Sequence, residues 1–567
     1  VISEKDLKRY GGINMYDSLR QVSGLHIMAG TVSQPDISIR GMNELNSNST
    51  LLLIDGRNIY LPIQGVFLWE TIPIQMNEIK QIEVVKGPVA SLYGANAFSG
   101  MINVISKSPD EINGTIVSCK AGSDNTYIGS LVHGNKLDIL GYKVSLGWKR
   151  FDMFEHDDYE TDLNKFNTEL VFDLNNVSKL SLSGGAVFGE FPLNVGTLGE
   201  YNNESSYAKI EYVYDDLECK LFWNYGNVDY ITAKFGTIDA LMHDYEVEIK
   251  YNFDVLDKHT VTFGGGGRYD YAKSNILATE DNEKDQTLWN VYIQDDFELT
   301  DKFRLVSSGK LDHHSIAGYN PTGRVAGIYW FTEHHLLRTS AGNSFRTPTL
   351  NEYYERLSYA GQYTVNVNGN KDLTAEKIIT GEIGYDGSFY DKKIKSKLDV
   401  FCSRIRNSID TANAGMSSLA PPVIEQKIMN AGKIYTWGIE PEIKYKITDW
   451  LTCTANYSYQ DIDFNDGVVV KYTPKHKVNM STILTIMKNI TASVYGHYVG
   501  EAEVSDALSV KNNIDEYFLL NARMAYEFFD DAEIGVSGSN LNNDKHREMI
   551  DGEEIGMRII GDVTVKF

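Results

Sequence analysis

From about Gly114 to the C-terminal Phe567, polar and apolar side chains alternate along the chain. Residues 217–225, for example, read LECKLFWNY, with mainly apolar and aromatic residues on one face. Because successive side chains of a β-strand point to opposite faces, each such segment predicts a strand with one apolar face. About 22 segments of roughly 10–14 residues repeat the pattern, a length typical of tilted strands that cross a membrane. We therefore expect an antiparallel transmembrane β-barrel of about 22 strands.

The links between these segments alternate in length. Short links lie at 175–176, 215–216, 254–258, 300–302, 391–393, 448–450, 488–489 and 530–531. Longer links lie near 152–164, 188–205, 230–242, 274–286, 346–376, 410–426, 463–472, 499–516 and 543–556. Short turns at one end of a membrane barrel and long loops at the other produce this alternation, whereas a soluble sandwich has no reason to sort its loops. Two links at positions where long loops are expected, 122–125 and 315–319, are short.

Composition agrees with a chain of many strands. The chain has 48 Gly and 35 Tyr but 12 Pro, a mix typical of strands and tight turns. No apolar run is long enough for a transmembrane helix, as expected where only alternate residues of a strand meet lipid. The net charge of -24 argues against nucleic acid as a partner. The cysteines have no metal-site spacing and lie in phase with apolar neighbours, so we expect free, lipid-facing thiols at Cys119, Cys219, Cys402 and Cys453.

Residues 1–108 follow a different pattern and predict a small α+β domain, with the barrel at 109–567. Ser3 can N-cap a short helix that ends at Gly11, and Asn14 can cap a second helix that ends at Gly24. Strands are expected near 37–40, 51–54, 82–85 and 102–105. Such a domain has only a modest core of its own, so we expect a surrounding wall to support it.

Residues 79–107 read IKQIEVVKGPVASLYGANAFSGMINVISK, which is a strand, a Gly-rich segment and a second strand. The stretch closely resembles the plug signature of TonB-dependent outer-membrane receptors. Two upstream stretches, ISIRG at 37–41 and LLLIDG at 51–56, resemble further signatures of the family at the right spacing. Lys86 stands where the family usually has Arg, which keeps the charge but loses the bidentate fork.

The barrel resembles the same family at scattered points. These are FRTPTLNE at 345–352, GNKDLTAEK at 369–377, Asn540-Leu541, and a last strand that ends in Phe567. A signal peptide and a TonB box, both usual in the family, are not recognisable in the chain. The resemblance implies a plug inside the lumen of a monomeric barrel in the outer membrane of a Gram-negative bacterium.

The resemblance also implies active transport and no enzymatic activity. The partners would be TonB with its inner-membrane energising complex, outer-membrane lipid and a metal chelate, most simply a ferric siderophore, with no cofactor besides that transported chelate. Haem receptors of the family use an axial His in the plug and another in the loop around 346–372. His26 lies in the plug, but residues 346–372 contain no His. Haem and cobalamin stay open as ligands, and a passive channel or adhesion barrel is the alternative from a different class.

Contacts between plug and wall should be polar, because a plug that moves needs contacts that water can replace. By resemblance the plug residues are Arg40 and Lys86, with Glu83 nearby. Their wall partners are expected among Glu382, Glu440 and Glu442.

Ligand contacts are expected on the upper side of the plug and on the longest loop. The plug residues, placed to face outward, are Tyr60, Gln64, Phe67 and Trp69. The alternative is that half of these residues belong to the plug core. The loop residues are Arg346, Tyr353, Tyr354, Arg356, Tyr359 and Tyr363. Aromatic side chains with a few cations suit an iron–catecholate chelate through stacking and cation–π contacts. Tyr is also common at the rims of membrane barrels whatever they bind.

Overall fold

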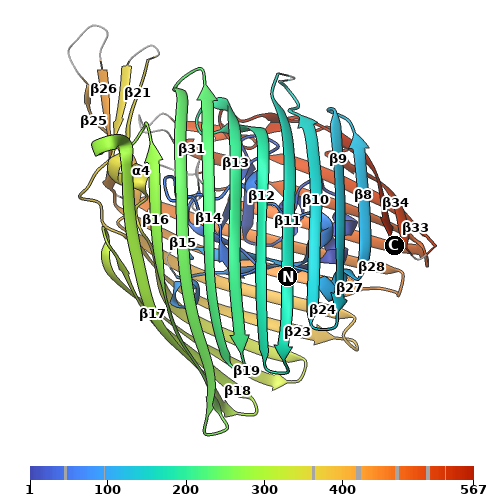
Figure 1. Cartoon of the computed structure of the whole chain (residues 1–567). Coiled ribbons are helices and arrows are strands. Elements are labelled where there is room, and N and C mark those ends of the chain that lie inside the picture. The colour runs from blue at the N-terminus through green and yellow to red at the C-terminus, as the bar shows by residue number, and fades with distance from the viewer. Residues whose placement is uncertain are drawn as a thin grey trace.

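The computed structural model describes residues 1–567 except 42, 44–46, 95, 157, 361–363, 417–422, 466–471, 506–510 and 530. In the described part of the chain, 22 antiparallel strands form one closed barrel, with the last strand paired to the first (Figure 1). In order along the chain they are β8 (Gly114–Gly122), β9 (Thr126–Leu137), β10 (Leu140–Asp152), β11 (Glu160–Asn175), β12 (Ser178–Asn194), β13 (Leu198–Tyr214), β14 (Leu217–Thr232), β15 (Gly236–Val255), β16 (His259–Ser274), β17 (Glu283–Thr300), β18 (Phe303–His314), β19 (Gly318–Thr332), β20 (His335–Arg346), β23 (Glu376–Phe389), β24 (Ile394–Arg406), β27 (Lys433–Lys446), β28 (Leu451–Asn465), β29 (His476–Met487), β30 (Ile490–Val499), β33 (Tyr517–Phe528), β34 (Ala532–Ser539) and β37 (Arg558–Lys566). The predicted barrel is confirmed.

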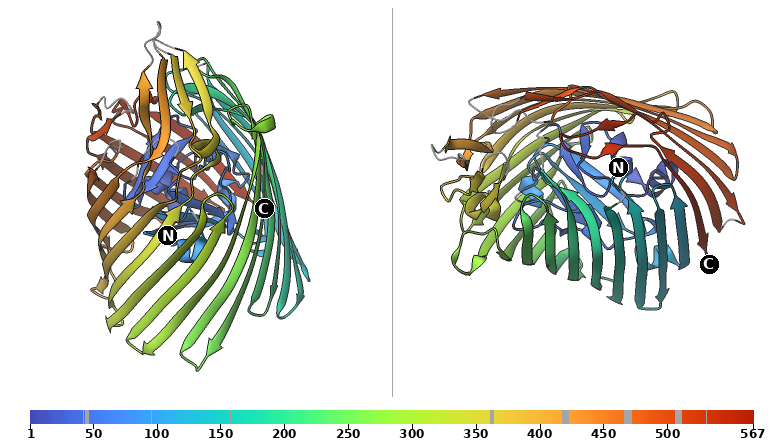
Figure 2. Two further views of the ribbon diagram at one scale, coloured as in Figure 1. Left: turned by 90° about the vertical axis from the view of Figure 1, so that its left-hand side faces the viewer. Right: turned by 90° about the horizontal axis from the view of Figure 1, so that it is seen from above.

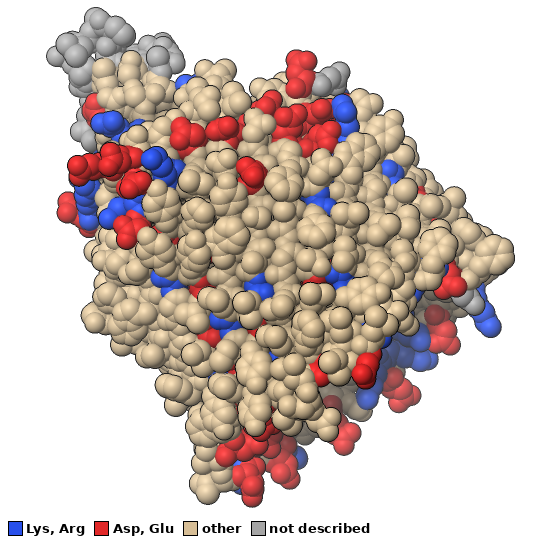
Figure 3. All heavy atoms as spheres, viewed as in Figure 1, with Lys and Arg blue, Asp and Glu red and all other residues tan. Residues whose placement is uncertain are grey.

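The alternating pattern places apolar side chains on the outside of this wall. On β14, Leu221 is 51% exposed whereas the next residue, Phe222, is 3% exposed and faces the lumen. Figure 3 shows charged side chains gathered above and below a broad band in which uncharged side chains dominate. Such an apolar band between two polar edges is the surface that a bilayer requires of a barrel. No helix among the described residues is long and apolar enough to cross a membrane. All four cysteines are free.

Short links join the strands at one end, which is the periplasmic end in barrels of this kind. The longest links, 347–375, 407–432 and 540–557, lie at the opposite, extracellular end. Two predicted long loops were wrong, because β12 and β13 continue to a short link at 195–197, and β14 and β15 to one at 233–235. These hairpins stay paired because Phe191, Tyr201 and Tyr230 on their inner faces pack in one apolar cluster with the plug.

Residues at the start of the chain lie inside the barrel as a plug (Figure 2). Its main sheet has the order β1 (Ile2–Ser3), β6 (Ile79–Lys86), β7 (Gly100–Ser106), β4 (Thr50–Ile54) and β5 (Arg57–Asn58), and β2 (Leu25–Ala29) pairs with β3 (Pro35–Ile39) beside it. Ser3 caps α1 (Glu4–Tyr10) in a capping box, and Gly11, with φ 74°, ends it as predicted. Short helices α2 (Ala90–Tyr93), α3 (Pro109–Ile112), η2 (Trp69–Thr71) and η3 (Met76–Glu78) complete it.

The predicted second helix was wrong. Only a short 3-10 helix, η1 (Asp17–Gln21), forms there, and β2 follows it. The Asn14 amide side chain donates to the Tyr16 hydroxyl (2.5 Å) instead of capping the backbone, so the turn is held by side chains of the plug.

The extracellular links carry structure of their own. The link after β20 contains α4 (Leu350–Tyr354), β21 (Arg356–Ala360) and β22 (Thr364–Asn368). The two strands of this link form a sheet with β25 (Ile409–Met416) and β26 (Val423–Asn430). Smaller elements are η4 (Glu280–Asn282), β31 (Ala502–Ser505), β32 (Lys511–Ile514), β35 (His546–Arg547) and β36 (Glu554–Ile555). The last two belong to residues 540–557, hereafter the inner loop.

Candidate functional site

On one side of the lumen, plug cations meet carboxylates of the wall; we call this the cationic-plug contact. Arg40 follows β3 in a left-handed conformation (φ 57°). Its guanidinium contacts Glu440 on β27 (3.0 Å) and Glu382 on β23 (2.5 Å). Lys86, at the end of β6, contacts Glu440 as well and lies 3.4 Å from Asp399 on β24. The predicted plug cations therefore lie together against two of the three wall carboxylates named from the sequence.

The environment of Arg40 is buried but electrostatically matched. Burial alone would lower the pKa of Arg40, but the facing carboxylates of Glu440 and Glu382 outweigh it and raise the pKa. The guanidinium also lies 4.1 Å from the ring centre of Phe401, a cation–π contact. Arg40 is therefore charged in any state in which the plug is docked.

Two predicted members of this contact lie elsewhere. Glu83 accepts a hydrogen bond from the Gln81 side chain (2.7 Å), and Glu442 lines a cavity on the periplasmic side of the contact. Because side chains alternate along β6, Glu83 and Lys86 do not share one face. Asp399, which the sequence reasoning missed, lies on the lumen-facing phase of β24.

On the opposite side of the lumen the charges are reversed; we call this the anionic-plug contact. Glu70 of the plug contacts Lys149 on β10 (2.5 Å) and Lys165 on β11 (3.3 Å). Glu78 accepts hydrogen bonds from Ser145 (2.7 Å) and Asn167 (3.0 Å) of the same strands. The sequence reasoning missed these pairs; the one available signal was that the two lysines lie on the lumen-facing phase of their strands.

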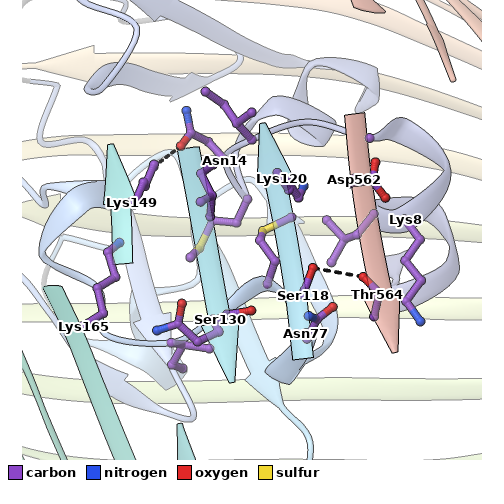
Figure 4. A pocket seen from close by; sticks show the side chains of 18 of the residues that line it. Lys8, Asn14, Asn77, Ser118, Lys120, Ser130, Lys149, Lys165, Asp562 and Thr564 are labelled. Carbon is purple, nitrogen blue, oxygen red and sulfur yellow. Dashed lines mark hydrogen bonds between the residues drawn. The ribbon is translucent and has the colours of Figure 1, made fainter. Parts of the chain in front are cut away.

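The two contacts differ in the space beside them. A cavity of about 130 Å³ adjoins the anionic-plug contact, and Figure 4 shows Lys149 and Lys165 among its lining residues. A cavity of about 600 Å³, hereafter the lower cavity, adjoins the cationic-plug contact. The anionic-plug contact therefore borders a space for a few water molecules, and the cationic-plug contact borders a space several times larger.

A third contact joins the plug to the inner loop. Glu548 of this loop is buried, pairs with Arg20 (2.7 Å) and accepts the Ala29 N–H (2.8 Å). Burial would raise the pKa of Glu548, but Arg20 and His546 hold it below its usual range. Glu553 accepts the Val32 N–H (2.7 Å), and burial raises the pKa of its carboxyl to about 7.

Four of the predicted ligand residues have buried side chains that the extracellular solvent does not reach. Phe67 and Trp69 pack in the central core of the plug, because the barrel around the plug supplies burial that a free domain would lack. Arg346 is enclosed by Glu376 (2.6 Å) and Glu352 (2.9 Å). Tyr353 is 1% exposed and packs with Leu373 and others. Direct ligand contact was therefore the wrong expectation for these four residues in this state.

Of the other two plug residues, Tyr60 is also buried and lies 5.4 Å (ring centre) from the guanidinium carbon of Arg268 on β16. Its expected outward orientation is therefore wrong. Gln64, at the tip of the same segment, is half-buried. Tyr363 lies outside the described residues.

The remaining loop residues lie at the extracellular edge, where tyrosines meet lysines. The Tyr359 ring lies 4.5 Å from Lys234 Nζ and 5.2 Å from the ring of Phe235, both from the β14–β15 link. The Tyr354 ring lies 5.8 Å from the ammonium of Lys284 and 5.3 Å from that of Lys371. Arg356 is exposed on β21. We call Lys234, Phe235, Lys284, Tyr354, Tyr359 and Lys371 the vestibule rim.

The plug histidine is placed poorly for a haem ligand. His26 lies in β2 and is 6% exposed. Burial and the neighbouring Lys477 lower its pKa well below the usual range. Its imidazole is therefore neutral and enclosed by the wall and the inner loop, not presented to the extracellular side.

Two family models match the chain: the TonB-dependent receptor plug domain over residues 1–101, and the TonB-dependent receptor-like β-barrel over residues 121–541. The chain belongs to the TonB-dependent receptor family. It is an outer-membrane receptor of a Gram-negative bacterium and not an enzyme. Membership implies that it interacts with TonB and with a ligand.

Known relatives of this receptor carry different ligand names. It is 23% identical to the iron-regulated outer membrane virulence protein of Vibrio cholerae (95% of this chain, 88% of the relative). It is 24% identical to the vitamin B12 transporter BtuB of Vibrio vulnificus (100% and 92%). Among solved structures, a variant of the ferric enterobactin receptor of Pseudomonas aeruginosa superimposes with a TM-score of 0.84 at 16% identity (100% and 98%). The siderophore receptor PirA of Acinetobacter baumannii gives 0.83 at 17% (100% and 98%). At such identity the structures establish the fold alone.

Proposed function

We propose that this receptor imports an anionic iron chelate of the ferric-siderophore class, with energy supplied through TonB by its inner-membrane complex. The observation that carries the proposal is the vestibule rim, where Tyr354 and Tyr359 are each within cation–π distance of lysine side chains. A ferric tris-catecholate is both aromatic and anionic, so it can stack on the tyrosines and pair with the lysines. The iron-regulated relative and the siderophore-receptor neighbours support the same class.

The receptor acts as a monomer in this proposal, because one chain supplies the closed barrel, the plug and the rim. The plug is held against the wall by charged contacts on two sides, which favours energy-coupled transport over a passive channel or adhesion barrel. No cofactor is needed, since the iron is cargo.

The first test measures binding of ⁵⁵Fe-enterobactin to de-energised cells that carry the receptor. Replacing Lys234, Lys284 and Lys371 together by Gln should weaken binding by about tenfold or more, because three positive charges near one anion act together. Tyr359→Ala should also weaken it. The matched controls are Lys392→Gln and Tyr390→Ala, both in the exposed β23–β24 turn at the periplasmic end. Equal binding by the rim and control variants would contradict the proposed role of the rim.

Cobalamin is the second candidate, favoured by the similarity to the vitamin B12 transporter. Cobalamin does not need a cluster of lysines for its recognition in the way that an anionic chelate does. Saturable binding of ⁵⁷Co-cobalamin that the triple Gln variant leaves unchanged, with no binding of ferric chelates, would favour this candidate.

A further inference from the structure

The lower cavity is the largest of the described spaces between plug and wall. Its volume is about 600 Å³, whereas three other cavities that are lined by both plug and wall residues have volumes of about 130, 100 and 50 Å³. On the plug side it is lined by Val84, Val85 and Lys86 at the end of β6. On the wall side it is lined by residues of β19, β20, β23, β24, β27, β28, β29 and β30. It therefore follows one sector of the barrel.

The cationic-plug contact closes this cavity on its extracellular side. Asp399 and Glu440, which pair with Lys86, and Glu382, which pairs with Arg40, line the cavity. Further toward the extracellular ends of the same three strands, Ile378, Ile405 and Ile434 pack on Phe98 of the plug. Among the described residues, this ion-pair cluster and this apolar layer therefore lie between the cavity and the extracellular side in this sector.

Cations without an ion pair line the same cavity. Arg324, Lys397 and Lys444 border it, and none of them has a carboxylate within 4.0 Å among the ion pairs of the described residues. Arg338, by contrast, is held by Asp386 (2.6 Å) and Asp399 (2.9 Å). Six carboxylates line the same cavity: Asp6, Glu382, Asp386, Asp399, Glu440 and Glu442. The unpaired cations offset part of this negative charge, which lowers the electrostatic cost for an anion that passes.

We infer that the lower cavity is the periplasmic half of the route that the chelate takes through the barrel. The chelate crosses along the β19–β30 sector after Arg40 and Lys86 leave their wall carboxylates, and Arg324, Lys397 and Lys444 offset the charge of the carboxylates that it passes. This inference rests on the proposed function, because it needs an anionic cargo. It adds the side of the plug on which the cargo passes.

The test fills the cavity without touching either the rim or the ion pairs. Ser481 and Thr454 are paired neighbours on β29 and β28, half-buried, and line the lower cavity. Ser481→Phe and Thr454→Phe place a ring in the route. The matched control is Ser130→Phe on β9, which faces the narrow cavity on the opposite side (Figure 4). The shift in gel mobility on heating shows that each barrel is folded.

Two measurements separate this inference from the proposed function. Binding of ⁵⁵Fe-enterobactin to de-energised cells should stay within about twofold in all three variants, whereas the initial import rate should fall about tenfold or more in the Ser481 and Thr454 variants only. The inference alone is overturned if binding is normal and import is not reduced in the Ser481 and Thr454 variants. It is also overturned if binding is normal and the Ser130 variant loses as much import as they do. Absence of binding by the unmodified receptor overturns the proposed function and this inference with it.

A second arm tests the unpaired cations. Arg324→Gln should lower the maximal import rate by about threefold with unchanged binding, and Arg324→Lys should restore it, because the charge is what acts. A merely structural role for Arg324 would instead change the folded fraction or fail to be restored by Lys. Import by the Gln variant at the unmodified rate removes Arg324 from the route.

Discussion

The plug is held on two sides of the lumen by ion pairs of opposite sense. At the cationic-plug contact, Arg40 and Lys86 face wall carboxylates; at the anionic-plug contact, Glu70 faces wall lysines. Each contact has a buried pair at its centre, Arg40 with Glu440 and Glu70 with Lys149, so neither is a weak surface pair. What differs is the space beside them, about 600 Å³ in the first case and about 130 Å³ in the second.

This difference separates two tasks. Where water can enter, it replaces a lost partner, so ion pairs can part at moderate cost. Where the adjoining space is small, fewer water molecules can compensate a buried charge that loses its partner, so the loss costs more. We therefore expect the anionic-plug contact to anchor the plug and the cationic-plug contact to release it.

The largest effect should follow from breaking the anchor. Glu70→Gln keeps the shape of the side chain but leaves Lys149 and Lys165 without their carboxylate, which should destabilise plug docking by about 3–5 kcal/mol. The measurement is the urea concentration at which a protease cuts the plug in detergent-solubilised receptor. Lys80→Gln, at an exposed pair with Glu111, is the control and should change little. A Glu70 variant as resistant as the control would remove the anchor role.

A smaller effect is expected at the opposite contact. Arg40→Gln leaves Glu382 and Glu440 facing Lys86 and the lower cavity, so water and Lys86 compensate part of the loss. We expect about 1–3 kcal/mol in the same protease assay, less than for Glu70→Gln. If Arg40→Gln costs more than Glu70→Gln, the two contacts have the reverse roles. Arg9→Gln, a half-buried plug cation, serves as the control.

The same two contacts show how far the sequence alone could lead. Period-2 alternation predicted the wall, and the Ser3 capping pattern predicted α1, because each depends on neighbours in the chain. Arg40 and Lys86 were found through family signatures. Glu70 with Lys149 was not, because polar residues on lumen-facing phases look alike until the plug is placed and the registers are known.

Burial inside the barrel explains most of the wrong site residues. The aromatic residues Phe67 and Trp69 look like a ligand surface when the plug is considered alone, yet they form its core. Arg346 looks like a free cation in a long loop, but Glu352 and Glu376 enclose it once that loop folds back. Residues such as Tyr354 and Tyr359 stayed near the surface because their partners, the rim lysines, are themselves solvated.

The inner loop supplies a third contact of intermediate kind, since one carboxylate, Glu548, holds a plug cation and a plug amide together. Glu548→Gln should weaken docking of this loop by about 1–3 kcal/mol, because Arg20 stays buried with a neutral partner. Hydrogen exchange of the amides in 540–557 should become faster, whereas exchange of the amides around Glu70 should change little. Glu554→Gln, at a partly exposed pair with Lys545, is the control. Glu553 makes two further contacts with the plug, because its N–H donates to the Gly30 carbonyl (3.0 Å) and its carboxylate accepts the Val32 N–H. Unchanged exchange would show that these contacts suffice to hold the loop.

The smallest effect concerns pH, and it separates the inner loop from the other two contacts. Burial raises the pKa of Glu553 to about 7, with Glu155 acting in the same sense, and the hydrogen bonds from Phe154 and Val32 and the charge of Arg558 opposing it. A carboxyl with a raised pKa in the docked state contributes stability below its ordinary pKa that is lost as pH rises through about 7.

Docking of the inner loop should therefore weaken by about 1 kcal/mol between pH 6 and pH 8. Glu548 adds nothing to this change, because its pKa is lowered in the docked state and its carboxyl is ionised in both states across this window. Hydrogen exchange of 540–557, corrected for the intrinsic pH dependence, measures the change, and Glu553→Gln should abolish it. A slope that persists in the Gln variant would assign the titration to another group, such as Glu355 in the loop after β20, whose pKa burial also raises to about 7.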